Sequence, residues 1–196
     1  MPESPPTPQA RPGPSLAALP DQVLAARAGD GDQESFAELM RRHTPRMLAL
    51  ATRMLDDRQA AEDEVQEACL AVWRKLPDFR GDSAFGTWLY RIVTNRCLNA
   101  LRARRTEVPL DEAREPASTD PADLPERAAE SHASVDGLRA ALATLTPEQR
   151  ACWVLRELHG MTYDEIAEVT GIGEPAVRGR IFRARRQLTE AMAPWR

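Results

Sequence analysis

The strongest constraint on how this chain folds is a glycine-centred break, Gly171-Ile172-Gly173, between two short helical patterns. Glycine adopts backbone angles that other residues avoid, so the break predicts a tight turn. Pro175 follows at the start of the second pattern, where its missing N–H costs nothing. Apolar residues recur at helical spacing before the break, at Tyr163, Ile166, Ala167 and Val169. Residues 161–188 are therefore predicted to form two helices joined by a tight turn.

The second of these helices is basic. Residues 174–196 contain six arginines and two acids. A helix-turn-helix with a basic second helix has the geometry that enters a DNA major groove. The net charge of −4 conceals this local excess of positive charge. Residues 91–105 form another basic block, with five arginines and no acid, whereas residues 107–134 carry eight acids and two arginines.

The remaining pattern predicts an all-α fold of two small helical domains. Seven prolines in residues 1–20 indicate a disordered tail. Residues 107–134, acidic and with four prolines, indicate a flexible linker. The domains are expected at residues 21–106 and 135–194. Asp21, Asp32 and Thr146 are predicted to cap helices, and Asp56-Asp57 to end one.

The helix predicted at residues 58–76 has two faces. Val65, Ala68 and Val72 mark the core side, whereas Leu70 and Trp73 fall on the acidic side. In one interpretation Trp73 folds onto a neighbouring helix and Leu70 is an ordinary exposed leucine. In the other, this side is a docking face for a partner helix. The pattern leaves both open.

The helix predicted at residues 85–105 carries a polar stripe beside its core face. Its members are Trp88, Arg91, Asn95, Asn99 and Arg102. Arginines neutralise phosphates, amides read base edges and aromatic rings stack on unpaired bases. A solvated polar face with one half-buried tryptophan explains the stripe equally well.

Two segments resemble a known family. AAEDEVQEACLAVWRKLPDFRGDSAFGTWLYRIVTNRCLNALRARR resembles region 2 of the extracytoplasmic-function (ECF, group 4) sigma factors of the sigma-70 family. LTPEQRACWVLRELHGMTYDEIAEVTGIGEPAVRGRIFRARRQL resembles their region 4. The resemblance covers residues 21–194. It implies a promoter-specificity subunit of RNA polymerase that has no catalysis of its own.

The resemblance also implies a role for each domain. Region 2 would dock on the clamp helices of the largest polymerase subunit, through Glu64, Gln66, Glu67, Leu70 and Trp73. It would open the −10 element and capture a flipped base, through Phe79, Trp88, Arg91, Asn95, Arg96 and Asn99. The family often breaks the helix near Asn95–Asn99, whereas the residue pattern predicts one continuous helix over residues 85–105.

Region 4 would read the −35 duplex and contact the flap of the other large polymerase subunit. The matching DNA-binding residues are Glu174, Arg178, Gly179, Arg180, Phe182 and Arg183. This chain departs from the family at Glu174-Pro175 and at Gly179, where a serine is usual. Glu174 is interpreted as a first-turn acid favoured by the helix dipole, in preference to an acceptor from cytosine.

The family implies further partners and a location. An anti-sigma factor, membrane-bound or zinc-binding in some systems, would hold the protein inactive until a stress or other signal arrives. The free protein is expected to be a cytoplasmic monomer without a cofactor or metal, since its three cysteines form no CxxC pattern. The linker would either imitate nucleic acid in the polymerase cleft or serve as a solubilising tether.

Two other functions fit parts of the sequence. A helix-turn-helix repressor or activator with an N-terminal sensor domain would dimerise to read paired half-sites. An enzyme acting on nucleic acid would need a nucleophile–base set, a phosphate loop or an acid cluster with metal-ligand spacing, and none is evident.

Overall fold

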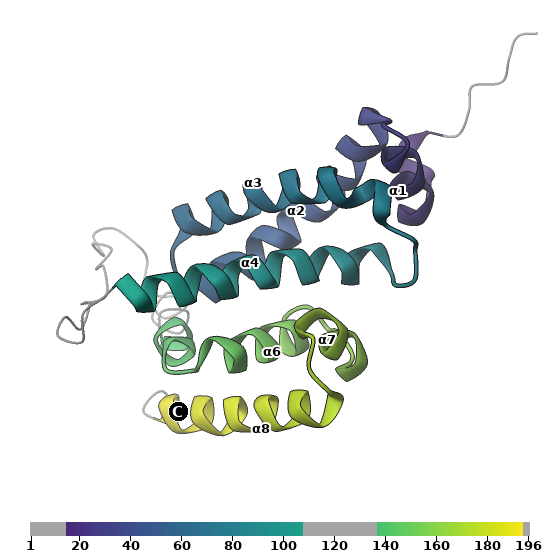
Figure 1. Cartoon of the computed structure of the whole chain (residues 1–196). Coiled ribbons are helices and arrows are strands. Elements are labelled where there is room, and N and C mark those ends of the chain that lie inside the picture. The colour runs from purple at the N-terminus through teal and green to yellow at the C-terminus, as the bar shows by residue number, and fades with distance from the viewer. Residues whose placement is uncertain (1–14, 108–136, 194–196) are drawn as a thin grey trace, which may run out of the picture.

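The computed structural model describes residues 15–107 and 137–193, and these two ranges contain helices and no strand. The N-terminal unit, residues 15–107, consists of α1 (Asp21–Gly29), α2 (Gln33–Leu55), α3 (Arg58–Lys75) and α4 (Phe85–Glu107), with 3-10 turns at Leu16–Ala18 and Leu76–Asp78. The C-terminal unit, residues 137–193, consists of a helical segment at 137–143, then α6 (Pro147–Glu157), α7 (Tyr163–Thr170) and α8 (Glu174–Ala191). The all-α prediction is confirmed (Figure 1).

Two of the three predicted helix caps are confirmed. Asp32 accepts hydrogen bonds from the backbone N–H groups at the start of α2, and Thr146 forms a capping box with Gln149. The prediction for Asp21 is wrong, because α1 begins at Asp21 itself and Pro20 occupies the cap position. The Asp21 carboxylate instead binds Arg42 and His43 of α2, at 2.8 and 2.6 Å.

Residues 15–20, which the sequence places in the proline-rich tail, are packed onto α2. Arg42 donates to the backbone carbonyls of Leu16, Ala17 and Leu19. One guanidinium thus fixes this segment immediately before α1. Residues 1–14 of the predicted tail and 108–134 of the predicted linker lie outside the described residues.

The N-terminal unit is built around buried faces of α2, α3 and α4. Met47, Val65, Val93 and Cys97 lie in its core. Burial raises the pKa of the Cys97 thiol to about 12, so this cysteine is a packing residue. The chain leaves α2 at Asp56, whose φ of 55° is left-handed and ends the helix as predicted.

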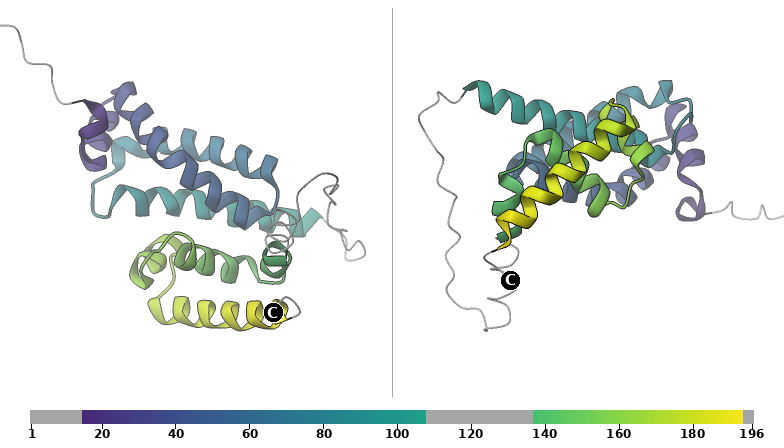
Figure 2. Two further views of the ribbon diagram at one scale, coloured as in Figure 1. Left: turned by 180° about the vertical axis from the view of Figure 1, so that it is seen from behind. Right: turned by 90° about the horizontal axis from the view of Figure 1, so that it is seen from below.

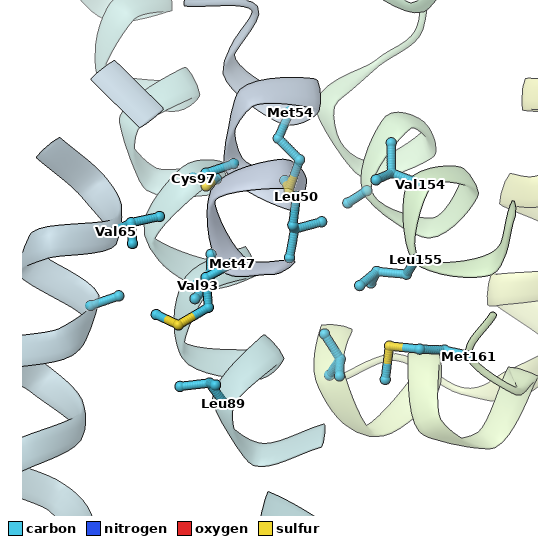
Figure 3. Close-up of a cluster of buried hydrophobic side chains, with 14 of the residues drawn as sticks. Met47, Leu50, Met54, Val65, Leu89, Val93, Cys97, Val154, Leu155 and Met161 are labelled. Atoms are coloured by element: carbon cyan, nitrogen blue, oxygen red, sulfur yellow. The ribbon is translucent and has the colours of Figure 1, made fainter. Parts of the chain in front are cut away.

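The buried core continues from the N-terminal unit into the C-terminal unit. A single cluster contains Leu50 and Met54 of α2 together with Val154 and Leu155 of α6 and Met161 of the following loop. Figure 3 shows these side chains facing one another across the boundary. Figures 1 and 2 show that α6 and α7 lie between α4 and α8. The two units therefore pack directly against each other, an arrangement that the sequence pattern does not reveal.

Candidate polymerase and promoter interfaces

An aromatic cluster forms where the chain enters α4. The Phe79 ring centroid lies 4.9 Å from that of Trp88 and 5.8 Å from that of Phe85. Phe85 is buried, whereas Phe79 and Trp88 are half-buried. The structure thus brings together two of the residues predicted for −10 binding, with ring surface partly open to solvent. Such a surface can stack on an unpaired base.

The continuous helix predicted at residues 85–105 is confirmed. The helix runs without interruption from Phe85 to Glu107. Beyond Gly86 the segment contains neither glycine nor proline, and Thr94, Cys97 and Leu98 are buried through the region where the family often breaks the helix. The polar stripe therefore stays on one helix, and Arg91, Asn95 and Asn99 are exposed along it.

Arg96 is turned away from that stripe towards α3. Its Nε donates to Glu64 Oε2 at 2.8 Å, and its Nη2 lies 3.8 Å from Glu67 Oε2. The structure therefore pairs one residue predicted to bind DNA with two residues predicted to bind polymerase.

The remaining members of the predicted docking face lie elsewhere on α3. Gln66 is exposed, Leu70 is 44% exposed and Trp73 is 36% exposed. The Trp73 ring also packs edge-on against Phe36 of α2, with centroids 4.8 Å apart. Trp73 thus folds onto a neighbouring helix, as one interpretation holds, and still leaves an apolar surface beside Leu70, as the other requires.

The helix-turn-helix is confirmed between residues 162 and 191. Thr162 and Glu165 form a capping box at the start of α7, and Gly171 ends that helix with a φ of 69°. The inner side of α8 packs through Val177, Ile181, Ala184 and Leu188. Phe182, on the outer side, is 69% exposed. Among the exposed large apolar side chains of the described residues, Phe182 has the largest exposed fraction.

The predicted −35 residues divide into two groups on α8. Arg178 donates to the Glu174 carboxylate at 2.8 Å and lies over the Tyr163 ring, 4.8 Å from its centroid. Arg156 lies over the same ring at the same distance. The hydrogen bond from Arg178 lowers the pKa of Glu174, which suits a first-turn acid engaged with its own helix.

The second group faces the N-terminal unit. Arg180 and Arg183 line a cavity of about 430 Å³ together with Leu98 and Arg102 of α4. Gly179 lies beside Arg183, and a Cβ at position 179 would meet a guanidinium nitrogen at 3.4 Å, an ordinary van der Waals contact.

The described ranges, residues 15–107 and 137–193, contain neither a grouped set of metal ligands nor a membrane-spanning helix. Within these ranges no three His, Cys, Asp or Glu side chains are grouped to hold a metal ion. Within the same ranges no helix has the length and apolar character needed to cross a membrane.

Comparison with known proteins identifies the two units. Residues 39–107 match the family model for sigma-70 region 2, and residues 136–188 match that for sigma-70 region 4. The chain is 37% identical to the RNA polymerase sigma-H factor of Pseudomonas aeruginosa, over 89% of this chain and 94% of the relative. It is 34% identical to the ECF RNA polymerase sigma-E factor of Escherichia coli K12, over 90% and 96%.

A solved structure shows the same likeness. The sigma factor RpoE of Bartonella quintana, crystallised with the anti-sigma factor NepR, matches with a TM-score of 0.63 and 25% identity. The match covers 81% of this chain and 97% of that one. Both regions, in family order and over nearly the full length of the relatives, place this chain among the ECF sigma factors of the sigma-70 family.

Proposed function

We propose that this ECF sigma factor binds core RNA polymerase and directs it to promoters through two separate DNA-reading surfaces. The N-terminal unit opens the −10 element and the C-terminal unit holds the −35 duplex. The observation that carries this proposal is the half-open Phe79–Trp88 pair beside the exposed side chains of α4. The proposed regions are residues 21–106 for region 2, 107–134 for the linker and 135–194 for region 4.

The −10 surface suits a single strand. Unstacking a base costs a few kcal/mol, which stacking on Phe79 and Trp88 helps to offset. Arg91 places positive charge beside this ring pair, and Asn95 and Asn99 offer amides that can hydrogen-bond base edges. Arg96 is also proposed for this surface, where it would have to exchange its Glu64 partner for DNA.

The −35 surface suits duplex DNA. Phe182 stands on the outer side of α8, with Arg178 and Glu174 to one side of it and Gly179 and Arg183 to the other. Arg180 completes the proposed set. Neutralised phosphates would supply most of the affinity, so binding should weaken steeply as salt rises.

The polymerase surface is proposed on α3. Leu70 and Trp73 supply an apolar patch and Gln66 a polar partner, a composition that fits the clamp helices of the largest subunit. Glu64 and Glu67 belong to the proposed set as well, although both lie near Arg96. The C-terminal unit would contact the flap of the other large subunit.

An anti-sigma factor is proposed as the inhibitory partner, membrane-bound or zinc-binding as in some family systems. The co-crystal of B. quintana RpoE with NepR supports this assignment. The protein would act in the cytoplasm, where RNA polymerase works, on genes that respond to stress or another signal. It is proposed to be a monomer when free.

Run-off transcription tests the proposal. Purified core polymerase is incubated with genomic promoter fragments, with and without the full-length protein. The proposal predicts new transcripts that start at defined promoters and require both proteins. A dimer that binds duplex DNA without polymerase and yields no new transcript would instead indicate a helix-turn-helix repressor.

A further inference from the structure

We propose that a small cavity between α2, α4 and the turn after α6 binds the phosphate group of a small phosphomonoester. The cavity has a volume of about 330 Å³, at the lower end of the range for small-ligand pockets. Its lining consists of side chains that can donate hydrogen bonds to an anion and of two apolar ones: Arg46, Ala49, Arg53, Tyr90, Leu158 and His159. The inference goes beyond the sigma function and does not depend on it, because the ligand requires neither polymerase nor DNA.

Two arginines supply positive charge from one side of α2. Arg46 and Arg53 lie roughly 10 Å apart along the helix, at about 1.5 Å per residue, with the small Ala49 between them. Both arginines are exposed, and Arg53 Nη1 donates to the Ala49 carbonyl at 3.2 Å, which folds its side chain back towards Arg46. Among the residues that the structure describes, the cavity has no acidic lining residue and neither guanidinium has an ion-pair partner. The two guanidiniums can therefore bind an anion placed between them.

Tyr90 and His159 form the half-buried wall of the cavity. His159 Nδ1 lies 3.2 Å from the Tyr90 hydroxyl, and the two rings pack edge-on with centroids 5.1 Å apart. Burial raises the pKa of Tyr90, so its hydroxyl keeps a proton to donate. When His159 is protonated, its Nδ1–H donates to the Tyr90 oxygen, which leaves the Tyr90 O–H to donate to the anion. Protonation of His159 thus adds a charge and directs a hydrogen-bond donor towards the cavity.

His159 lies in a positive environment that an anion would neutralise. Burial lowers the pKa of His159, and the charges of Arg53 and Arg46 lower it further. Tyr90 faces the imidazole from α4, and the neighbouring carboxylate of Glu157 is already paired with an arginine of α8 at 2.6 Å. An anion between the two arginines of α2 would favour the imidazolium and raise the pKa of His159. Binding of the anion and binding of the proton should therefore strengthen each other.

The cavity suits a terminal phosphate better than the phosphodiester of a nucleic acid. A phosphomonoester is close to a dianion at neutral pH and has three acceptor oxygens, which match two guanidiniums and two further donors. A backbone phosphate carries one charge and is flanked by two sugars, which hinder its approach to the half-buried Tyr90 and His159. Leu158, which is 41% exposed, offers apolar surface to the organic part of the ligand.

Isothermal titration calorimetry of the full-length protein tests the site, with phenyl phosphate as the probe. At pH 7 and low salt, its dissociation constant should be about 1 mM or lower. The double variant Arg46→Gln with Arg53→Gln should weaken binding at least about ten-fold. The matched control is Arg41→Gln with Arg58→Gln, which removes the same charge from two exposed arginines paired with glutamates of their own helices. This control should bind within about two-fold of the wild-type protein.

The coupling of anion to proton gives an independent measurement. Sulfate is the probe, because it stays dianionic between pH 8 and pH 5, whereas a phosphomonoester takes up a proton near a pH of about 6. Sulfate affinity should rise by about 3- to 10-fold as the pH falls across this range, and it should stay within about two-fold in His159→Gln. The His159 imidazole resonance, followed by NMR in the wild-type protein, should titrate at higher pH in sulfate than in chloride.

Three results would overturn the proposal. The first is no saturable binding of phenyl phosphate up to roughly 10 mM, or equal losses in the site variant and the matched control. The second is dimethyl phosphate binding as tightly as methyl phosphate, which would assign the cavity to a nucleic-acid backbone. The third is inorganic phosphate binding as tightly as phenyl phosphate, which would assign it to free phosphate. A His159 titration that sulfate leaves unchanged would refute the contact with the half-buried wall, and this measurement requires no variant to fold.

Discussion

Arg96 of α4 donates through Nε to Glu64 Oε2 of α3 at 2.8 Å, which joins the helix proposed to read the promoter to the helix proposed to dock on polymerase. Both side chains are partly shielded from solvent, with exposed fractions of 32% and 23%. Glu64 therefore has a partner within the protein. A test of its role in polymerase binding must separate this pairing from a direct contact with polymerase.

The variant Glu64→Gln distinguishes a Glu64 that only holds Arg96 from a Glu64 that contacts core polymerase. The pair is partly exposed, so its loss should cost about 1 kcal/mol of stability or less. If Glu64 mainly holds Arg96, affinity for core polymerase should stay within about two-fold, as measured by fluorescence anisotropy. Glu62→Gln, on the same helix and paired with Arg58, is the matched control. A loss greater than ten-fold in Glu64→Gln alone would show that its carboxylate contacts polymerase.

Phe79→Ala should impair promoter opening. The substitution removes one ring of the pair with Trp88, and a lost base–aromatic stack costs about 1–3 kcal/mol, or roughly 5- to 150-fold in the opening equilibrium. Permanganate reactivity of unpaired thymines in the −10 element measures this loss. Phe79→Tyr keeps the ring and should retain most of the opening. Core-polymerase affinity should remain within a few-fold, and its collapse would mean that the pocket is misplaced.

Leu70→Asp should weaken binding to core polymerase. The charge would enter an apolar contact, and truncated or disrupted interface anchors commonly cost about 2 kcal/mol or more, near thirty-fold in affinity. Because Leu70 is exposed in the free protein, the melting temperature should change little. Val23→Asp, at another exposed apolar side chain on α1, is the control. Equal affinities for the two variants would contradict docking through α3.

Acidic pH should loosen the contact between the two units. Burial lowers the pKa of His159, and the charges of Arg53 and Arg46 on α2 lower it further. Tyr90 of α4 faces the same imidazole. His159 packed between the units therefore favours the neutral ring. Its contribution to the stability of the contact between the units is complete above the usual histidine pKa of about 6.5 and declines as pH falls below that value.

The radius of gyration, measured by scattering between pH 8 and pH 5.5, checks this dependence. It should increase towards acidic pH in the wild-type protein and change less in His159→Gln, which cannot be protonated in this range. An identical pH response in both proteins would assign the effect to other groups.

Local structure was predictable where one residue dictates the backbone. The caps at Asp32 and Thr146 and the turn at Gly171 follow from side-chain oxygens and from glycine's freedom at positive φ. The stripe through Asn95 was likewise readable from helical periodicity. The continuous helix over residues 85–105 was also predictable from composition, and continuous burial along α4 accounts for its departure from the break that the family often has near Asn95–Asn99.

Long-range pairing was not predictable from the sequence. Periodicity places Arg96 on a side of α4 but does not reveal that Glu64 lies opposite. Leu98 and Met161 have the pattern of ordinary core residues, so nothing in the sequence marked them as part of a contact between two units. The contacts of Arg139 and Arg150 with the end of α2 were not predictable either. Their partners include backbone carbonyls, which no pattern of side chains reveals.

The most direct test of the central claim, that two separate surfaces hold one promoter, is a DNase footprint of the reconstituted polymerase. The wild-type protein should protect both the −35 segment and the −10 segment of the promoter. Phe182→Ala should abolish protection of the upstream segment, because the exposed Phe182 ring lies on the proposed −35 surface. Phe79→Ala should leave both segments protected while the −10 element stays double-stranded. An upstream footprint that survives Phe182→Ala at full strength, or protection that needs no polymerase, would contradict the account.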